Sequence, residues 1–334
     1  MPRLSVLLPC RDAEAYLGQA MRCLEAQTYR DFEVVAVDDG STDETAALLA
    51  SWSSRDPRVQ LLSPGRVGLV EALRLGTAHC SGDLLARFDA DDLAQPTRFA
   101  EQIGYLDARP RVAAVGTRIR YFPWERVGWG ARRYQTWLNR LSEPDELARD
   151  IFVECPVAHP SMMIRRESLA RVGGYRANGW PEDYDLVLRL HAGGARLANV
   201  PRVLHFWRET DGRASRTDPR YSREAFLRCK IEFLRRGALK SRREVRIWGA
   251  GVVGKGLARA LRSSGIEVAA FYDIDPRRIG QEVHGAPVLD IGEVARRRDA
   301  YLLVAVGAAG ARELIRAELT AAGFCEPADY RVVA

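Results

Sequence analysis

The sequence predicts an α/β protein, in which a mostly parallel sheet flanked by helices is followed by a second, smaller α/β unit. At 334 residues the chain is too long for one ordinary hydrophobic core. Short apolar runs alternate with helical patterns from the N-terminus onward, and the same alternation starts again near residue 245. A basic stretch at residues 237–243 separates the two parts, so we expect domains at residues 1–238 and 239–334.

The first half of the chain is predicted to consist of strands joined by helices. The expected strands are residues 4–8, 32–37, 59–62 and 84–88, and the expected helices are residues 13–27 and 67–79. Ser41 and Glu44 have the spacing of a capping box, which predicts the start of another helix. Parallel sheets bind ligands beyond the carboxyl ends of their strands. The polar groups that follow these strands are therefore the first candidates for a site.

The second half contains one irregular region and then a new α/β pattern. Residues 127–156 hold Trp129, Tyr134 and Trp137 among several arginines and are expected to form a partly helical insertion. A helix at residues 221–236 is expected to close the first domain. The second domain is expected to have a helix at residues 252–263 and strands at residues 245–248, 268–272, 288–289, 302–306 and 331–333.

Composition and charge narrow the choice of partners. No apolar run reaches the roughly 18–20 residues of a membrane helix. The six cysteines never have CxxC spacing, so reduced thiols in a cytoplasmic protein are expected. The net charge of +6 suits nucleic acid, an anionic membrane surface or phosphorylated ligands. No nucleic-acid-binding module is present in the pattern, so we expect no nucleic acid partner.

Two acidic clusters follow predicted strands. Asp38 and Asp39 follow one strand, and Asp89, Asp91 and Asp92 follow another. Three carboxylates within four residues repel one another unless a cation, hydrogen-bond donors or water relieve the repulsion. Mg²⁺ or Mn²⁺ held by one or two such carboxylates completes its shell with water and phosphate oxygens. The alternative is an exposed acidic turn that caps a helix.

The wider context of these clusters resembles family 2 glycosyltransferases of the GT-A fold. The resemblance extends over roughly residues 3–215 and rests on six segments in the same order and spacing: LLPCRD at 7–12, QTY at 27–29, VDDGSTD at 37–43, ARFDADD at 86–92, PTR at 96–98 and ED at 182–183. It implies transfer of a sugar from a nucleotide diphosphate donor, expected to be UDP-linked, with Mn²⁺ or Mg²⁺ as cofactor.

The resemblance also implies roles for the donor-side residues. Pro9 would line the nucleotide base, and Asp39, supported by Asp38, would hold it. Asp89 and Asp91 would bind ribose and metal, with Asp91 the first choice as metal ligand and Asp92 the weaker candidate. The flanking guanidinium groups are expected either to contact phosphate or to brace the aspartates; they belong to Arg87 and Arg98. The family usually has Asn where this chain has Asp12, which either alters base preference or points away.

The Glu182-Asp183 pair resembles the motif that carries the catalytic base of inverting family members. We assign the base to Asp183, with Glu182 as second candidate; helix capping is the compatible structural alternative. His159 and Trp180 are candidates for the acceptor side. The segment after the catalytic helix resembles one that closes over the donor, so guanidinium contacts to the diphosphate are expected there, from Arg208 or Arg213.

The second domain carries a glycine motif between a predicted strand and a predicted helix. Gly249, Gly251 and Gly254 have the GxGxxG spacing, and Asp273 ends the next strand. The region resembles small Rossmann-like domains attached to sugar-modifying enzymes. NAD(P) binding there is one interpretation, and packing or regulation without a ligand is the other.

Together these features predict an inverting glycosyltransferase of cell-surface polysaccharide or glycolipid biosynthesis. Its acceptor would be a glycan or a lipid-linked sugar, and the protein would be cytoplasmic with peripheral contact at the inner face of the membrane. The aromatic residues and arginines of residues 127–156 would either touch that membrane or pack the acceptor subsite or a partner. Two alternatives are an NAD(P)-dependent nucleotide-sugar oxidoreductase and a catalytically silent nucleotide-sugar sensor.

Overall fold

The computed structural model describes residues 1–210, 212–296 and 299–334, which form two compact units. The first unit contains residues 1–148 and 156–218, and the second contains residues 149–155 and 219–334. The sequence placed the boundary at residue 238. Helix α10 (Arg223–Arg236), expected to close the first domain, clusters with the second unit instead.

The first unit is built on an eight-stranded sheet with the order β3-β2-β1-β4-β7-β6-β8-β5. Its strands are β1 (Leu4–Cys10), β2 (Phe32–Asp38), β3 (Val59–Leu62), β4 (Leu84–Arg87), β5 (Leu93–Ala94), β6 (Val112–Phe122), β7 (Met163–Arg165) and β8 (Arg196–Arg208). Strands β1 to β4 pair in parallel, as do β6 and β8, whereas β5 and β7 run antiparallel to their neighbours. The expectation of a mostly parallel sheet is confirmed.

Helices cover both faces of this sheet, which explains why every residue of β1 is buried. Val6 and Leu8 pack in the core that includes Leu17 of α1, while Leu7 faces α3. A Cβ on Gly76 of α3 would lie 2.3 Å from the Leu7 Cδ1, so a glycine is required for this helix to approach the sheet. The helices of the unit are α1 (Glu14–Glu25), α2 (Thr45–Arg55), α3 (Leu69–His79), α4 (Arg98–Ala108), α5 (Trp129–Leu138), α6 (Pro144–Asp150, which ends in the second unit), α7 (Arg166–Arg171), α8 (Glu182–Ala192) and α9 (Ala214–Thr217).

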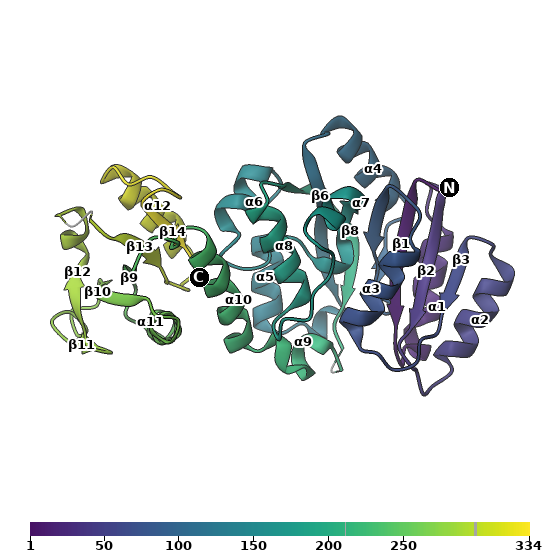
Figure 1. Cartoon of the computed structure of the whole chain (residues 1–334), viewed down its shortest axis with the longest axis horizontal. Helices are drawn as coiled ribbons and strands as arrows, with labels where there is room; N and C mark the ends of the chain where they lie inside the picture. The colour runs from purple at the N-terminus through teal and green to yellow at the C-terminus, as the bar shows by residue number, and fades with distance from the viewer. Residues whose placement is uncertain (211, 297–298) are drawn as a thin grey trace. The chain divides into compact units, whose positions relative to one another are not determined.

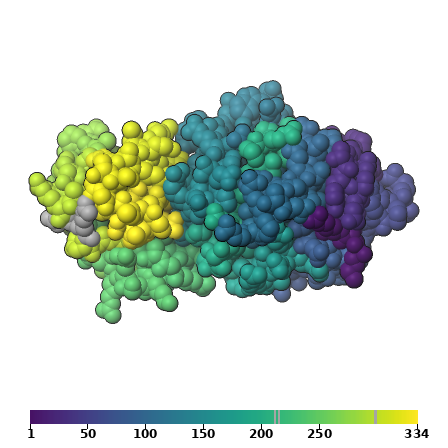
Figure 2. Space-filling view, turned by 90° about the horizontal axis from the view of Figure 1, so that it is seen from above, coloured from purple at the N-terminus to yellow at the C-terminus, as the bar shows by residue number. Residues whose placement is uncertain are grey.

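Strands β1, β2 and β3 lie side by side in Figure 1, with α2 beside β3. In Figure 2 the purple N-terminal part of the surface lies next to the blue part contributed by later elements. Arg3 in the N-terminal segment pairs with Asp107 of α4. A smaller apolar cluster joins α5 to β6 and β8 through Tyr121, Tyr134 and Trp207. Tyr134 and Trp137 of the expected partly helical insertion are therefore packed against the sheet.

The second unit is a six-stranded sheet with the order β11-β12-β10-β9-β13-β14. Its strands are β9 (Glu244–Trp248), β10 (Glu267–Asp273), β11 (Glu282–Val283), β12 (Ala286–Asp290), β13 (Tyr301–Val304) and β14 (Tyr330–Val332), and its helices are α10, α11 (Val252–Ser263) and α12 (Ala311–Ala321). The four pairs among β12, β10, β9, β13 and β14 are all parallel. The expected second α/β unit is therefore present.

Residues 149–155 belong to this second unit although they lie far from it in sequence. Arg316 pairs with Asp150 at 2.7 Å and with Glu326 at 2.8 Å. Lys230 donates to the carbonyls of Val153 (3.2 Å) and Val333 (2.7 Å). These polar contacts thus fasten the segment to α10 and α12. Among the described residues, no helix is both long and apolar enough to cross a membrane.

Candidate active site

The carboxyl ends of β1, β2 and β4 lie at one edge of the sheet. Cys10 pairs with Asp38, so β1 and β2 end level with one another, whereas the last residue of β4, Arg87, pairs with Leu7 three residues before the end of β1. Pro9 is buried in β1 immediately before this edge. The residues that follow the strands, Asp39 and Asp89, are consequently brought to the same edge from distant positions in the chain.

Asp38 and Asp12 organise the loops at this edge. The Asp38 Oδ1 accepts hydrogen bonds from the Ser41 amide at 3.2 Å and the Ser41 hydroxyl at 2.5 Å. The predicted capping box is therefore wrong, because Ser41 is bonded to Asp38 and α2 starts later, at Thr45. Asp12 has a φ of 44°, and its carboxylate accepts the Thr42 amide at 2.8 Å. Asp12 thus joins the two loops.

Asp39 is buried and holds the loop before α3. Its Oδ1 accepts the amides of Val67 and Gly68, both at 2.7 Å. A Cβ on Gly40, whose φ is +67°, would lie 2.7 Å from the Arg66 nitrogen, so this close approach requires glycine. Asp39 therefore fixes this loop, and its proposed contact with a base stays a prediction.

Asp89, Asp91 and Asp92 form an acidic cluster in which one carboxylate oxygen from each lies within 4.8 Å of the others. Burial, followed by repulsion from Asp92 and Asp89, raises the pKa of Asp91 to about 7. Burial and Asp89 likewise raise the pKa of Asp92 well above its ordinary value. Crowded carboxylates of this kind suit a divalent cation, which would relieve their repulsion.

Buried Arg87 interacts both with this cluster and with Glu182, the second candidate for the base. Its guanidinium pairs with Asp89 at 2.6 Å, and Glu182 and Tyr175 also act on it electrostatically. Glu182 and Asp183 open α8, where the helix N-terminus favours negative charge. The donor-side and base-side motifs, nearly 100 residues apart in the chain, thus both interact with the Arg87 guanidinium.

His159 and Trp180 are both engaged within the protein. His159 is buried, with Nε2 3.0 Å from the Tyr175 hydroxyl and Nδ1 3.8 Å from Glu182. Burial and Arg87 lower the pKa of His159 well below its ordinary value, so the ring is neutral. The Trp180 indole donates to Asp185 at 3.0 Å. An acceptor role for either residue stays a prediction, and His159 is placed to support Glu182.

Arg208 lies beside the acidic cluster at the end of β8. Its Nε donates to the Asp91 carbonyl at 2.6 Å, and its Nη2 donates to Gln19 at 2.7 Å. The guanidinium also stacks over the rings of Tyr16 and Phe122, at 4.5 and 4.4 Å. Arg208 is thus held next to the carboxylates, where a phosphate group could bind.

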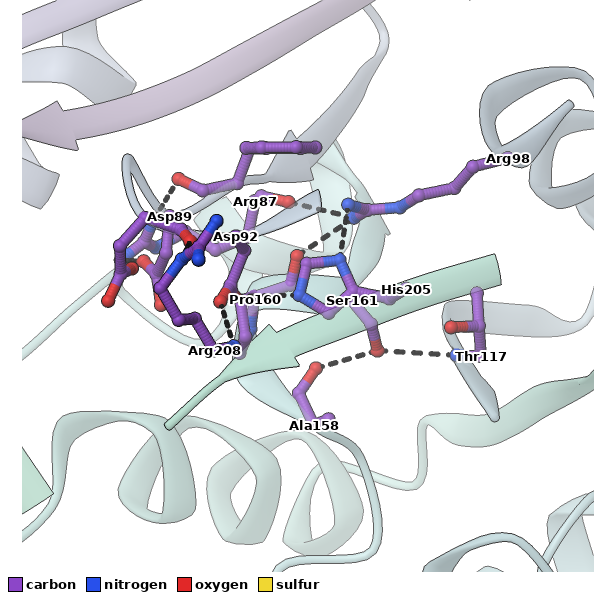
Figure 3. A network of polar contacts seen from close by, with 12 residues as sticks. Arg87, Asp89, Asp92, Arg98, Thr117, Ala158, Pro160, Ser161, His205 and Arg208 are labelled. Carbon is purple, nitrogen blue, oxygen red and sulfur yellow. Dashed lines mark hydrogen bonds and ion pairs between the residues drawn. The ribbon is translucent and has the colours of Figure 1, made fainter. Parts of the chain in front are cut away.

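The sequence predicted only part of the support behind this cluster. Arg98, expected either to contact phosphate or to brace the aspartates, is completely buried, which agrees with bracing and excludes contact with a ligand. Its Nη1 lies 3.1 Å from the His205 Nδ1, and the His205 Nε2 lies 2.8 Å from the Asp92 Oδ2 (Figure 3). The sequence around His205 mixes apolar, aromatic and charged residues, so nothing in the local pattern distinguishes this histidine from an ordinary strand residue.

In the second unit, the glycine motif forms the turn between β9 and α11. A Cβ on Gly254 would lie 1.8 Å from the Gly249 carbonyl oxygen, and Gly251 caps the helix. The Asp273 Oδ2 accepts the Ala250 amide at 2.8 Å and pairs with Arg278 at 3.0 Å. The carboxylate that would bind ribose is therefore occupied by the protein itself.

Comparison with known proteins identifies the family. The model of Glycosyl transferase family 2 matches residues 5–173, half of the chain. The protein belongs to this family. An uncharacterized glycosyltransferase of Haemophilus influenzae is 30% identical over 210 residues, covering 61% of this chain and 64% of the relative. The amylovoran biosynthesis glycosyltransferase AmsE of Erwinia amylovora is 30% identical over 189 residues, covering 56% and 68%.

A third relative and two solved structures agree with this assignment. The UDP-Gal:alpha-D-GlcNAc-diphosphoundecaprenol beta-1,3-galactosyltransferase of Escherichia coli is 25% identical over 206 residues, covering 61% of this chain and 73% of the relative. Mannosyltransferase PcManGT from Pyrobaculum calidifontis, solved with GDP-Man and Mn²⁺, has a TM-score of 0.52 at 21% identity, covering 70% of this chain and 62% of that chain. S. aureus TarS 1–349 with UDP-GlcNAc has a TM-score of 0.55 at 14% identity, covering 78% and 80%. The GT-A fold of this glycosyltransferase is thereby confirmed.

Proposed function

We propose that the chain is an inverting glycosyltransferase that transfers a sugar from a UDP-linked donor to a hydroxyl of a glycan or lipid-linked acceptor. The observation that carries the proposal is that buried Arg87 pairs with Asp89 and also interacts electrostatically with Glu182. This supports a site in which the acidic cluster binds the donor and a candidate base lies near it. Relatives named for amylovoran synthesis and for a diphosphoundecaprenol-linked acceptor support a role in cell-surface polysaccharide or glycolipid biosynthesis.

The donor would lie over the ends of β1, β2 and β4, with its base near Pro9 and Asp39. The acidic cluster fits Mn²⁺ or Mg²⁺, because its oxygens are close together and the pKa of Asp91 is raised to about 7 without a cation. Asp89 and Asp91 would hold the ion, which neutralises charge on the diphosphate leaving group. Arg208, fixed beside Asp91, would contact the same diphosphate.

Asp183 would act as the general base. The acceptor oxygen attacks the anomeric carbon from the side opposite the diphosphate, so a C–O bond forms as the bond to the diphosphate oxygen breaks. The acceptor proton passes to the Asp183 carboxylate, and the nucleotide diphosphate leaves with the bonding electron pair. Base catalysis of this kind contributes about 10²–10⁴-fold. A rigid helix start is a suitable mount for such a group.

The surface around α5 would meet a membrane that carries a lipid-linked acceptor. Trp129 and Trp124 are 74% and 48% exposed, and the guanidinium groups of Arg133 and Arg132 lie over their rings. Exposed Trp beside Arg suits the interface of an anionic bilayer. Flotation with anionic liposomes should recover the wild type and lose the Trp124→Ser/Trp129→Ser variant. Equal flotation of both, or no association of the wild type, would remove this proposal.

A donor screen tests the main proposal. The protein is incubated with a panel of sugar nucleotides and Mn²⁺, and release of nucleotide is measured with and without EDTA. We expect metal-dependent release from one or a few UDP-sugars, without any nicotinamide. This result would also exclude the oxidoreductase and the silent sensor. Absence of release from every donor, with acceptor extracts present, would contradict the proposal.

A further inference from the structure

His205 links two charged side chains in the interior of the first unit. Its side chain and those of Arg98 and Asp92 are all fully buried. The three groups form a row, in which Arg98 lies 3.1 Å from the His205 Nδ1 and Asp92 lies 2.8 Å from the His205 Nε2 (Figure 3). They come from α4, β8 and the segment after β4, so the row joins three separate parts of the chain.

The direction of the hydrogen bonds in this row is fixed by chemistry. A guanidinium only donates, so the His205 Nδ1 must accept from Arg98. The proton of the neutral ring is then on Nε2, which donates to the Asp92 carboxylate. Arg98 itself is immobilised, because its Nη2 donates to the carbonyls of Arg87 and Pro160 at 2.8 and 2.9 Å. The histidine tautomer is therefore set by a rigid group.

Asp92 passes this restraint to the edge of the site. Its Oδ2 is held by His205, and its Oδ1 accepts the Arg208 amide at 2.7 Å. Arg208 in turn donates from Nε to the Asp91 carbonyl at 2.6 Å. Both oxygens of Asp92 are thus engaged by protein donors, whereas Asp89 and Asp91 remain partly exposed.

We propose that His205 is a positioning residue that makes Asp92 a brace, so that Asp89 and Asp91 bind the cation and Arg208 faces the diphosphate. This inference rests on the proposed function, since it concerns the same donor site. Its basis is the hydrogen bond from the His205 Nε2 to Asp92, made by a ring whose Nδ1 is held by Arg98. Loss of comparable supporting partners typically weakens metal binding about 10–100-fold.

Paired substitutions test the proposal. His205→Leu fills similar volume without either hydrogen bond, whereas His205→Gln keeps a donor that can reach Asp92. We expect His205→Leu to weaken Mn²⁺ binding in the presence of UDP by about 10–100-fold, and His205→Gln to restore most of the loss. Binding is measured by calorimetry and by electron paramagnetic resonance of free Mn²⁺, so activity is not needed. His79→Gln, on the exposed end of α3, is the matched control.

The possible results separate this inference from the proposed function. If the wild type binds Mn²⁺ with UDP and His205→Leu binds it equally well, the positioning role is wrong and the transferase proposal stands. If the wild type binds neither UDP nor GDP with Mn²⁺, the proposed function fails and the inference fails with it. Should His205→Leu not fold, ¹⁵N NMR of the five histidines in the wild type decides. A proton on the His205 Nε2 supports the inference, and a proton on Nδ1 overturns it.

Discussion

Both units have aspartates at the carboxyl ends of parallel strands: a cluster of three in the first unit and Asp273 in the second. The pKa values of Asp91 and Asp273 are shifted in opposite directions. In the first unit, burial and neighbouring carboxylates raise the pKa of Asp91 to about 7. In the second, burial alone would raise the pKa of Asp273, but hydrogen bonds from the Asp275 and Ala250 amides and from Arg278 lower it overall. One site has charge that a ligand would relieve, and the other is already satisfied. The difference shows that strand-end position is a weaker indicator of ligand binding than unrelieved charge.

The largest expected effect is the loss of turnover when the proposed base of the first unit is replaced. Asp183→Asn removes the proposed base with little change in shape, so turnover should fall about 10²–10⁴-fold. Steady-state rates with the donor identified by the screen give the measurement. The matched control is Asp273→Asn in the second unit, which should leave turnover unchanged. Full activity of Asp183→Asn would shift the base assignment to Glu182.

A second prediction concerns buried charge in the second unit. Burial lowers the pKa of Lys230 to about 8, while Glu154 opposes this change. Lys230→Met would leave the Val153 and Val333 carbonyls without their donor and the half-buried Glu154 without a nearby cation, so we expect a loss of about 1–3 kcal/mol in unfolding free energy. Urea unfolding measures it. The double variant Lys230→Met/Glu154→Gln should recover much of the loss, and no recovery would mean that the lysine acts mainly through Val153 and Val333.

A smaller effect should depend on pH. The folded pKa of Asp91, about 7, exceeds the unfolded value of about 3.9, so the folded state binds more protons between these values. The unfolding free energy of the metal-free protein therefore falls as pH rises from about 4 to 7. Asp91→Asn should raise Tm by several degrees at pH 8 and by little near pH 4. Equal shifts at both pH values would contradict this origin.

The last prediction is that the second unit binds no nicotinamide cofactor. Because Asp273 is held by Ala250 and Arg278, we expect titration of NAD or NADH into the protein to give no binding heat. Calorimetry of the wild type measures this directly. Saturable binding that Asp273→Ala abolishes would instead establish a nucleotide site, and would make the two strand ends functionally alike.

The sequence predicted the elements whose patterns are local. Residues 59–62 coincide with β3 and residues 252–263 with α11. It missed β6 and β8. Pro201 interrupts the sequence pattern of β8, and the pairing between the two strands shifts register at several points. The acidic strand ends were predictable for the same local reason. His205 was not, since its partner Asp92 is 113 residues away.

The membership of residues 149–155 in the second unit limits how this enzyme can recombine. A chimera that exchanges the C-terminal part alone would leave Asp150 without Arg316 and Lys230 without the Val153 carbonyl. Evolutionary swapping of the second unit must therefore carry this short internal segment along. In related chains, substitutions in residues 149–155 should then be correlated with substitutions in α10 and α12, because the segment is inherited together with the second unit.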